Sequence, residues 1–281
     1  MTLRSFGLWW GTVEGASIAE LAAVAGAAGF GSISVTPAMY FAMREQGMSD
    51  ADLKSLLADS NVSVAMIDPL IKGLPGSPDP ASMAPRFRPT FEHGADDAFH
   101  AAEALGATAV NIAHYMGTPT PLEELSEAIA AIGRRAADRG LDILVEFMPE
   151  GGIRDLADAA QIVAQVNAPN VRIMLDTWHF FRTAGVLEHL EQLVPDSIGA
   201  VQVGDADAAA WGTGVNPPSP DRLLPGQGAV PVRDIVALAR RNNPAVVVGI
   251  EVFKRAAVNA PPLARAQAAA AAMAATLSAL E

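Results

Sequence analysis

The sequence predicts a single parallel (β/α)8 barrel that spans residues 1–281. Short apolar runs alternate with alanine-rich segments of helical periodicity along the whole chain, and eight strand-then-helix repeats are the number that closes a barrel. The strand runs are apolar throughout rather than alternating, which is typical of parallel strands that are covered on both faces. A length of 281 residues suits one large barrel domain.

Each repeat can be placed on the chain. The candidate strands are residues 4–8, 31–35, 62–68, 108–114, 142–147, 171–176, 198–203 and 246–252. The candidate helices lie near residues 17–28, 50–59, 92–105, 122–138, 154–166, 186–193, 232–242 and 263–280. Most strands begin about 27 to 34 residues after the previous one, a typical length for a βαβ unit. An open doubly wound sheet is the alternative, but no G-x-G-x-x-G motif follows the first strand.

Two connections are longer than the others, at about residues 69–90 and 204–230, and both are rich in proline, glycine and serine. Each follows the carboxyl end of a predicted strand, on the face where barrel active sites are built. Long irregular insertions at that face are typical of substrate-binding loops, although a surface excursion would have the same composition. We therefore expect both segments to border the active site.

The composition limits the class of protein. The chain is 51% apolar and 18% charged, which indicates a compact fold, and it has no cysteine, which excludes disulfides, a thiolate nucleophile and cysteine-ligated metals. A formal charge of −12 gives phosphate groups nothing to bind, so we expect neither nucleic acid nor a membrane as a partner. No signal peptide or membrane span is evident, so we expect a cytoplasmic protein that binds a small molecule; a homo-oligomer is compatible with the sequence.

Polar side chains occur near the carboxyl ends of four otherwise apolar strands: Glu146, Asp176, Gln202 and Glu251. Carboxylates from three strands that meet at one barrel mouth would repel one another, and burying even a neutral unpaired polar group costs roughly 2–7 kcal/mol. One divalent cation would offset that repulsion. The all-oxygen set suits Mg²⁺ or Mn²⁺ better than Zn²⁺ or Cu²⁺. The alternative is that each carboxylate pairs with a nearby arginine or caps a helix.

Two histidines lie near the same strand ends. If the chain turns from strand into loop after Asp176, His179 can reach the rim of the pocket, within an aromatic segment at residues 178–181. We expect His179 to act in catalysis or substrate contact. His114, at the end of the fourth strand, is a weaker candidate for substrate contact.

The segments ILVEFMP, MLDTWHFFR, AVQVGDA, RLLPGQG and GIEVF, in this order and spacing, resemble the xylose isomerase-like TIM barrel superfamily, the sugar phosphate isomerase/epimerase group. The resemblance covers essentially the whole chain. In that family a Glu, an Asp, a His or Gln, and a Glu at these strand ends bind Mn²⁺, Mg²⁺ or Co²⁺. The resemblance implies substrate contact for His179 and Arg222, and it implies metal-ligand roles for Glu146, Asp176, Gln202 and Glu251.

The chain departs from the family pattern on the seventh strand. Many relatives read His-x-Lys-Asp there, whereas this chain reads Gln202-Val-Gly-Asp205 and lacks the lysine. Glutamine at that position occurs in hydroxypyruvate isomerase-like members and in dehydratases that act on inosose or 3-dehydroshikimate. The motif therefore indicates the metal site better than it indicates the reaction.

The resulting functional prediction is a metal-dependent isomerase or epimerase that acts on a keto-sugar or a related small hydroxy-ketone. A metal that chelates the ketone oxygen and the neighbouring hydroxyl stabilises the enediolate that forms when the α-proton leaves. Glu146 and Glu251 are the expected acid and base. Arg222 would clamp the substrate or form a loop salt bridge, and Trp9 and Trp178 would pack on the substrate or in the core.

Three other functions are weighed against this one. A dehydratase would use the same enolate to expel a β-hydroxyl group. A DNA repair endonuclease of the same superfamily would need about three zinc ions and many histidines, which five histidines and a charge of −12 do not favour. A barrel that only binds a ligand would not need the intact carboxylate set.

Overall fold

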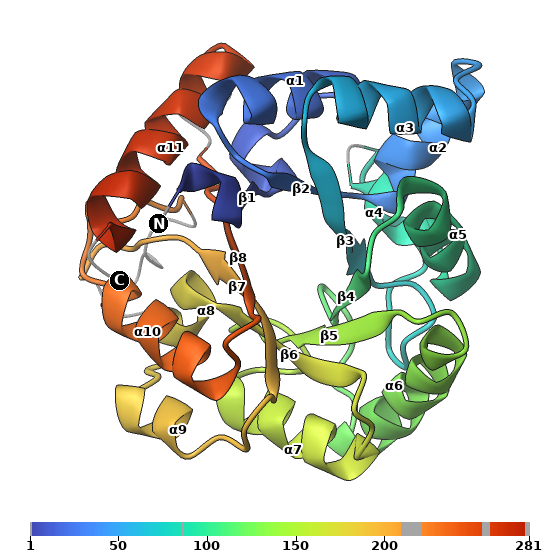
Figure 1. Ribbon diagram of the computed structural model, residues 1–281. Coiled ribbons are helices and arrows are strands. Elements are labelled where there is room, and N and C mark those ends of the chain that lie inside the picture. The colour runs from blue at the N-terminus through green and yellow to red at the C-terminus, as the bar shows by residue number, and fades with distance from the viewer. Residues whose placement is uncertain (1, 86, 209–220, 255–258, 279–281) are drawn as a thin grey trace.

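The strands close into a parallel barrel, as the sequence predicts (Figure 1). The computed structural model describes residues 2–85, 87–208, 221–254 and 259–278. Each strand pairs with the next along the chain, and β1 pairs with β8 to close the ring. The strands are β1 (Phe6–Leu8), β2 (Ser32–Val35), β3 (Ser63–Leu70), β4 (Ala109–Ala113), β5 (Asp142–Glu146), β6 (Val171–Asp176), β7 (Ile198–Val203) and β8 (Val247–Ile250).

Helices surround the barrel, and α11 packs beside α1, so that the two ends of the chain complete the outer ring (Figure 1). The α-helices are α1 (Ile18–Ala28), α2 (Pro37–Glu45), α3 (Asp50–Asp59), α4 (Arg88–Glu92), α5 (Ala95–Leu105), α6 (Leu122–Ala137), α7 (Leu156–Val166), α8 (Thr177–Arg182), α9 (Leu187–Glu191), α10 (Val232–Asn242) and α11 (Pro262–Leu277). The described residues also form the short 3-10 helices η1 (Leu3–Ser5), η2 (Trp10–Val13) and η3 (Pro80–Ser82). In the described residues, no helix is long and apolar enough to cross a membrane.

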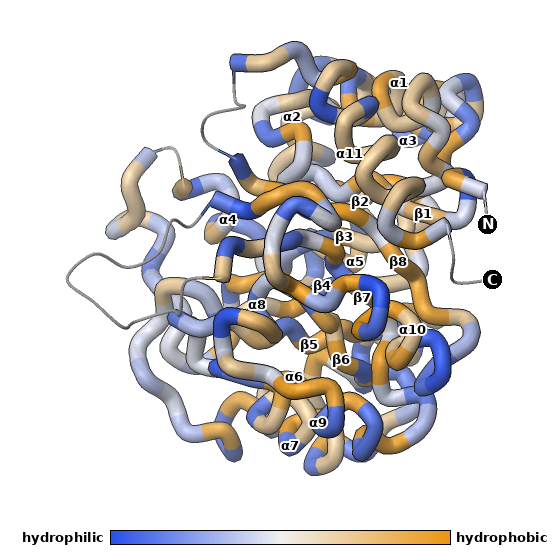
Figure 2. Tube along the Cα trace, turned by 90° about the vertical axis from the view of Figure 1, so that its left-hand side faces the viewer, coloured by the Kyte–Doolittle hydropathy of each residue, from blue (hydrophilic) through white to orange (hydrophobic). Residues whose placement is uncertain are grey.

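Side chains along each strand alternate between the helices and the inside of the barrel. The outward side chains join the helices in one large core, so the strands lie at the hydrophobic centre of the molecule (Figure 2). A separate, smaller core contains side chains from inside the barrel: Trp9, Met66, Ala109, Leu144, Met174 and Ala200. Trp9 is fully buried, and its ring occupies the space that side chains at Gly7 and Gly249 would need.

The next inward position on strands β3 to β7, two residues after each inner-core residue, is polar. With Glu251, two residues after Gly249, these buried side chains form what we call the polar ring: Asp68, Asn111, Glu146, Asp176, Gln202 and Glu251. The apolar inner core therefore forms the floor below the polar ring, and the ring lies at the carboxyl ends of the strands, where barrel enzymes place their sites.

The differences from the predicted elements are local. The first strand begins at Phe6 because residues 3–5 form η1, and the eighth ends at Ile250, so Glu251 follows β8 directly. Helices α2, α4 and α8 were not predicted. Asp176 is followed by a helix and not by the loop considered for this position, because the Asp176 side chain caps α8, which begins at the next residue.

The two long connections keep their place on the chain. The first is partly helical, since it contains η3 and α4. In the second, residues 209–220 lie outside the described residues, and the flanking residues return to the barrel through an antiparallel bridge between Asp205 and Leu223.

Candidate metal centre

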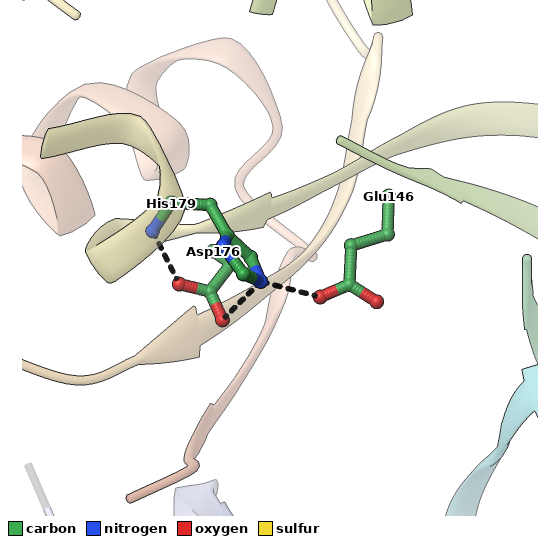
Figure 3. Close-up of side chains that lie close together, drawn as sticks. All are labelled: Glu146, Asp176 and His179. Carbon is green, nitrogen blue, oxygen red and sulfur yellow. Dashed lines mark hydrogen bonds and ion pairs between the residues drawn. The ribbon is translucent and has the colours of Figure 1, made fainter. Parts of the chain in front are cut away.

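Three side chains of the barrel mouth converge closely enough to hold one metal ion. Glu146 ends β5, Asp176 ends β6, and His179 lies on α8 and points back toward both carboxylates (Figure 3). One potential ligand atom from each residue lies within 4.8 Å of the others, and all three side chains are buried. His179 Nε2 lies 3.5 Å from Glu146 Oε1 and 3.8 Å from Asp176 Oδ2.

Local hydrogen bonds fix this geometry. Asp176 Oδ1 accepts a hydrogen bond of 2.9 Å from the His179 backbone N–H, so the cap of α8 also sets the distance between the two side chains. The Thr177 hydroxyl donates to the Gly204 carbonyl at 2.6 Å and accepts from the Gly204 N–H at 2.9 Å. These two bonds hold the ends of β6 and β7 together.

The other two predicted ligands, Gln202 and Glu251, contact each other. Gln202 Nε2 donates to Glu251 Oε2 at 3.1 Å. The Gln202 Oε1 is buried, and among the described residues it has no hydrogen-bond partner. A buried amide oxygen without a partner, next to carboxylates, matches what an oxygen ligand of a hard divalent cation requires. The residues present therefore fit such an ion.

Arg222 lies inside this group of carboxylates. Its Nη1 is 2.6 Å from Asp176 Oδ2 and 3.4 Å from Glu251 Oε2. The guanidinium group packs between the rings of Trp178 and Phe253, at 5.5 Å and 5.3 Å from their centroids. The predicted alternative for Arg222, a salt bridge within its own loop, is therefore not its main contact.

A buried carboxylate holds the segment that carries Arg222. Asp205 Oδ1 accepts hydrogen bonds from the backbone N–H groups of Ala206 and Val230, and Oδ2 accepts from those of Gly226 and Gly228, all at 2.8–2.9 Å. Its backbone also exchanges two hydrogen bonds with Leu223, the residue after Arg222. Asp205 thus fixes the position of the segment that carries Arg222.

The barrel raises the pKa of two carboxyl groups of the polar ring. Burial, followed by the charge of Asp68, raises the pKa of Glu251 well above its ordinary value, although Arg222 opposes the shift. Burial, followed by the charge of Glu146, raises the pKa of Asp68 from 3.8 to about 7. Burial and mutual repulsion therefore disfavour the charged forms of these carboxyl groups, and a cation bound at the mouth would offset both effects.

These shifts predict that the metal-free protein loses stability as the pH rises. The Asp68 carboxyl group binds its proton more tightly in the folded than in the unfolded state, so its contribution is fully present below about pH 4 and is lost as the pH rises through about 7. The loss is on the order of a few kcal/mol. Urea unfolding of chelator-treated protein near pH 5 and near pH 8 measures it, and Asp68→Asn should reduce the difference. Equal free energies of unfolding at both pH values would contradict the assignment.

His114 is held by backbone groups. Its Nε2 lies 2.8 Å from the Pro75 carbonyl oxygen, and its Nδ1 accepts from the Gly152 N–H at 3.0 Å. Both ring nitrogens are therefore engaged in joining the connection after β3 to the connection after β5. The structure favours this structural role over the predicted substrate contact.

The two predicted aromatic contacts differ in their surroundings. Trp9 belongs to the inner core below the polar ring, so the structure favours its core alternative. Trp178 is also buried, but it contacts the site, with its ring against Arg222 and edge-on to His179 at 5.3 Å between centroids. Trp178 is thus placed to orient those two side chains.

Sequence reasoning missed three buried polar residues of this region: Asp68, Asn111 and Asp205. For Asp68 and Asn111 the signal was available, because each is a polar residue near the carboxyl end of an apolar strand. For Asp205 the only signal was its place in the Gln202-Val-Gly-Asp205 motif, since its four hydrogen-bond partners are backbone groups up to 25 residues away.

Comparisons with known proteins give a consistent picture. The family model for the xylose isomerase-like TIM barrel matches residues 21–276. A protein of Streptomyces coelicolor, provisionally named a hydroxypyruvate isomerase, is 31% identical over 238 residues, which are 77% of this chain and 78% of that protein. An inosose isomerase of Bacillus subtilis is 28% identical over 117 residues, 41% of each chain. The crystal structure of the IOLI protein with a bound zinc atom matches this chain with a TM-score of 0.80 and 18% sequence identity. The match covers 100% of this chain and 99% of that one, and it shows that the two proteins share a fold.

Proposed function

Because the chain belongs to the xylose isomerase-like TIM barrel family, we propose that it is a divalent-metal-dependent isomerase or epimerase of a keto-sugar or a related small hydroxy-ketone. The observation that carries the proposal is the convergence of three buried potential metal ligands, Glu146, Asp176 and His179, at the barrel mouth. Such a set, on the face where barrel enzymes work, suits chemistry that creates negative charge on a ketone.

The proposed ligands are Glu146, Asp176, Gln202 and Glu251, with Mn²⁺ or Mg²⁺ as the ion and Co²⁺ as a further option. The bound ion would polarise the ketone and stabilise the negative charge that develops on its oxygen. The unpartnered Gln202 Oε1 supports a ligand role for that residue. His179 borders the same space and is proposed to contact the substrate.

The protein's own groups would move the proton. Glu146 comes from β5 and Glu251 follows β8, so within the polar ring they flank Asp176 and Gln202. Two carboxylates in this arrangement can reach the substrate from different sides, one to remove the α-proton and one to return a proton. The His179 Nε2, which lies 3.5 Å from Glu146 Oε1, faces the same space and is proposed to contact a substrate hydroxyl.

An isomerase or epimerase is favoured over the dehydratase alternative. The two relatives named above are both called isomerases. A direct test incubates the Mn²⁺-loaded protein with a ketohexose, hydroxypyruvate, scyllo-inosose and 3-dehydroshikimate, and separates the products by chromatography. An isomeric product supports the proposal. A conjugated enone, seen by its ultraviolet absorbance, would identify a dehydratase instead.

Arg222 is proposed to contact the substrate, and both its replacements should impair binding. Arg222→Lys should raise KM nearly as much as Arg222→Ala, about tenfold or more, because the planar guanidinium group uses separate nitrogens and two ring faces that an ammonium group cannot match. Steady-state kinetics with saturating Mn²⁺ measure this.

The matched control is Arg182→Lys. Arg182 is also buried and packs on Trp178, at 5.2 Å from its ring, but its salt bridge goes to Asp207. It should change KM far less. Unchanged kinetics in both Arg222 variants would remove that residue from the site.

A further inference from the structure

Two members of the polar ring, Asp68 and Asn111, have no part in the proposed metal centre or proton transfers. They lie on β3 and β4, the strands that precede the strand of Glu146 around the barrel. Both are buried, with 2% and 0% of their surface exposed. One step lower, the same strands carry Met66 and Ala109, which fill the barrel without polar atoms. Packing alone therefore does not account for polar groups at this depth.

The side-chain amide of Asn111 connects Asp68 to Glu146. The Asn111 Nδ2 donates to Asp68 Oδ1 and to Glu146 Oε2, both at 2.7 Å. The Asn111 Oδ1 is buried and lacks a partner among the described residues. Both hydrogens of the amide are used and its acceptor is not, directly beside the candidate metal centre.

Among the described residues, Asp68 also has no ion-pair partner. Asp176 and Glu251 both pair with Arg222, whereas no arginine, lysine or histidine of the described ranges forms an ion pair with Asp68. Its carboxylate oxygens can accept a hydrogen bond from a ligand hydroxyl, as the Asn111 Oδ1 can.

We propose that Asp68 and Asn111 bind a hydroxyl group of the substrate that lies beyond the reacting ketone and its neighbouring hydroxyl. A hydroxyl at this position can donate its hydrogen to the unpartnered Asn111 Oδ1 or to the neighbouring Asp68 carboxylate, both of which are acceptors. The inference rests on the proposed function and deepens it, since the reacting carbons would lie beside Glu146. It names the substrate class as a polyhydroxy ketone longer than three carbons, such as a ketose or an inosose, rather than hydroxypyruvate.

The test compares Asp68→Leu with the conservative Asp68→Asn, both loaded with Mn²⁺. For D-tagatose or scyllo-inosose, kcat/KM should fall about 10- to 100-fold in Asp68→Leu, the range expected for one hydrogen bond to an ionisable group, and Asp68→Asn should recover part of it. Solvent-deuterium exchange into the three-carbon ketone dihydroxyacetone should change little. The midpoint of thermal unfolding is measured for both variants, because Asp68→Leu leaves one Asn111 N–H without its acceptor whereas Asp68→Asn keeps an oxygen there.

The matched control is Asp142→Leu, at the opposite end of β5, where a half-buried carboxyl group pairs with Arg172. It should leave all kinetic constants unchanged. A lower melting temperature in both Asp68 variants, with equal losses on every ketone, would show a structural role and overturn the inference.

The inference and the proposed function fail in different ways. A wild-type protein that turns over hydroxypyruvate at least as efficiently as D-tagatose and scyllo-inosose would overturn the inference and leave the proposed function intact. A wild-type protein that exchanges the α-proton of none of these ketones would overturn the proposed function, and the inference with it.

Discussion

Replacement of Glu146 or Glu251 by glutamine is expected to nearly abolish turnover while the protein stays folded. Each substitution keeps the size of the side chain and one ligand oxygen but removes the base, and such losses are typically about 10²–10⁴-fold. Both variants should hold the metal more weakly, so turnover is measured in saturating Mn²⁺. The exposed residue Glu103, which pairs with Arg139, supplies the control Glu103→Gln, with unchanged kcat.

The two variants should also differ from each other. Glu146 accepts a hydrogen bond from Asn111 and faces His179, whereas Glu251 faces Gln202 and Arg222. If each carboxylate serves one side of the substrate, one variant should still exchange solvent deuterium into the α-carbon without completing turnover. Full recovery of both variants in saturating metal would show that the carboxylates are ligands only.

Removal of the metal should reduce turnover as strongly as the Glu146→Gln and Glu251→Gln substitutions. Purified protein is expected to contain about one Mn²⁺ or Mg²⁺ per chain, and chelation should remove the ion together with all activity. The melting temperature should fall as well, since an ion at about 100 times its Kd stabilises the folded state by about 2.7 kcal/mol. Elemental analysis and a thermal melt measure both. Active protein without metal would contradict the site.

Two alanine variants then show whether His179 is a metal ligand. Glu146, Asp176 and His179 lie close enough to hold an ion by themselves, whereas the proposed set uses Gln202 and Glu251 in place of the histidine. Asp176→Ala should lose the metal under either arrangement. His179→Ala should keep about one ion per chain if the proposed set is right. Loss of the metal from His179→Ala would assign the histidine as a ligand.

The strands could be predicted from the sequence because parallel barrel strands leave a strong signal. Their outward side chains join a large apolar core and their inward ones a smaller apolar core, so each strand is a continuous apolar run. The same logic singled out Glu146 and Asp176, since a charge at the buried end of such a run costs free energy unless it is paired. Applied to every strand, it would also have found Asp68 and Asn111.

The short helices left weaker signals. Helix α8 has six residues, three of them aromatic, and aromatic residues are poor helix formers. It forms because Asp176 caps it and because its side chains are buried, and burial is a tertiary effect. Helix α2 did carry a local signal, with Thr36 as its cap and Pro37 at its first position.

The surroundings of Arg222 could not be predicted from local patterns. Its partner Asp176 is 46 residues away in the sequence. Its position depends on Asp205, whose carboxylate accepts hydrogen bonds from backbone N–H groups such as those of Gly226 and Gly228. Such contacts exist only once the barrel has closed, so the sequence indicated the residue but not its neighbours.

The central claim is that the barrel mouth removes and returns a proton next to a ketone. Proton NMR of the substrate and product after incubation of the Mn²⁺-loaded protein in D₂O tests it most directly. Solvent deuterium should enter the carbon next to the ketone in the product and, more slowly, in the recovered substrate, and Glu146→Gln should abolish the product. Turnover that retains the substrate's own hydrogen, with no deuterium from solvent, would contradict the proton-transfer mechanism.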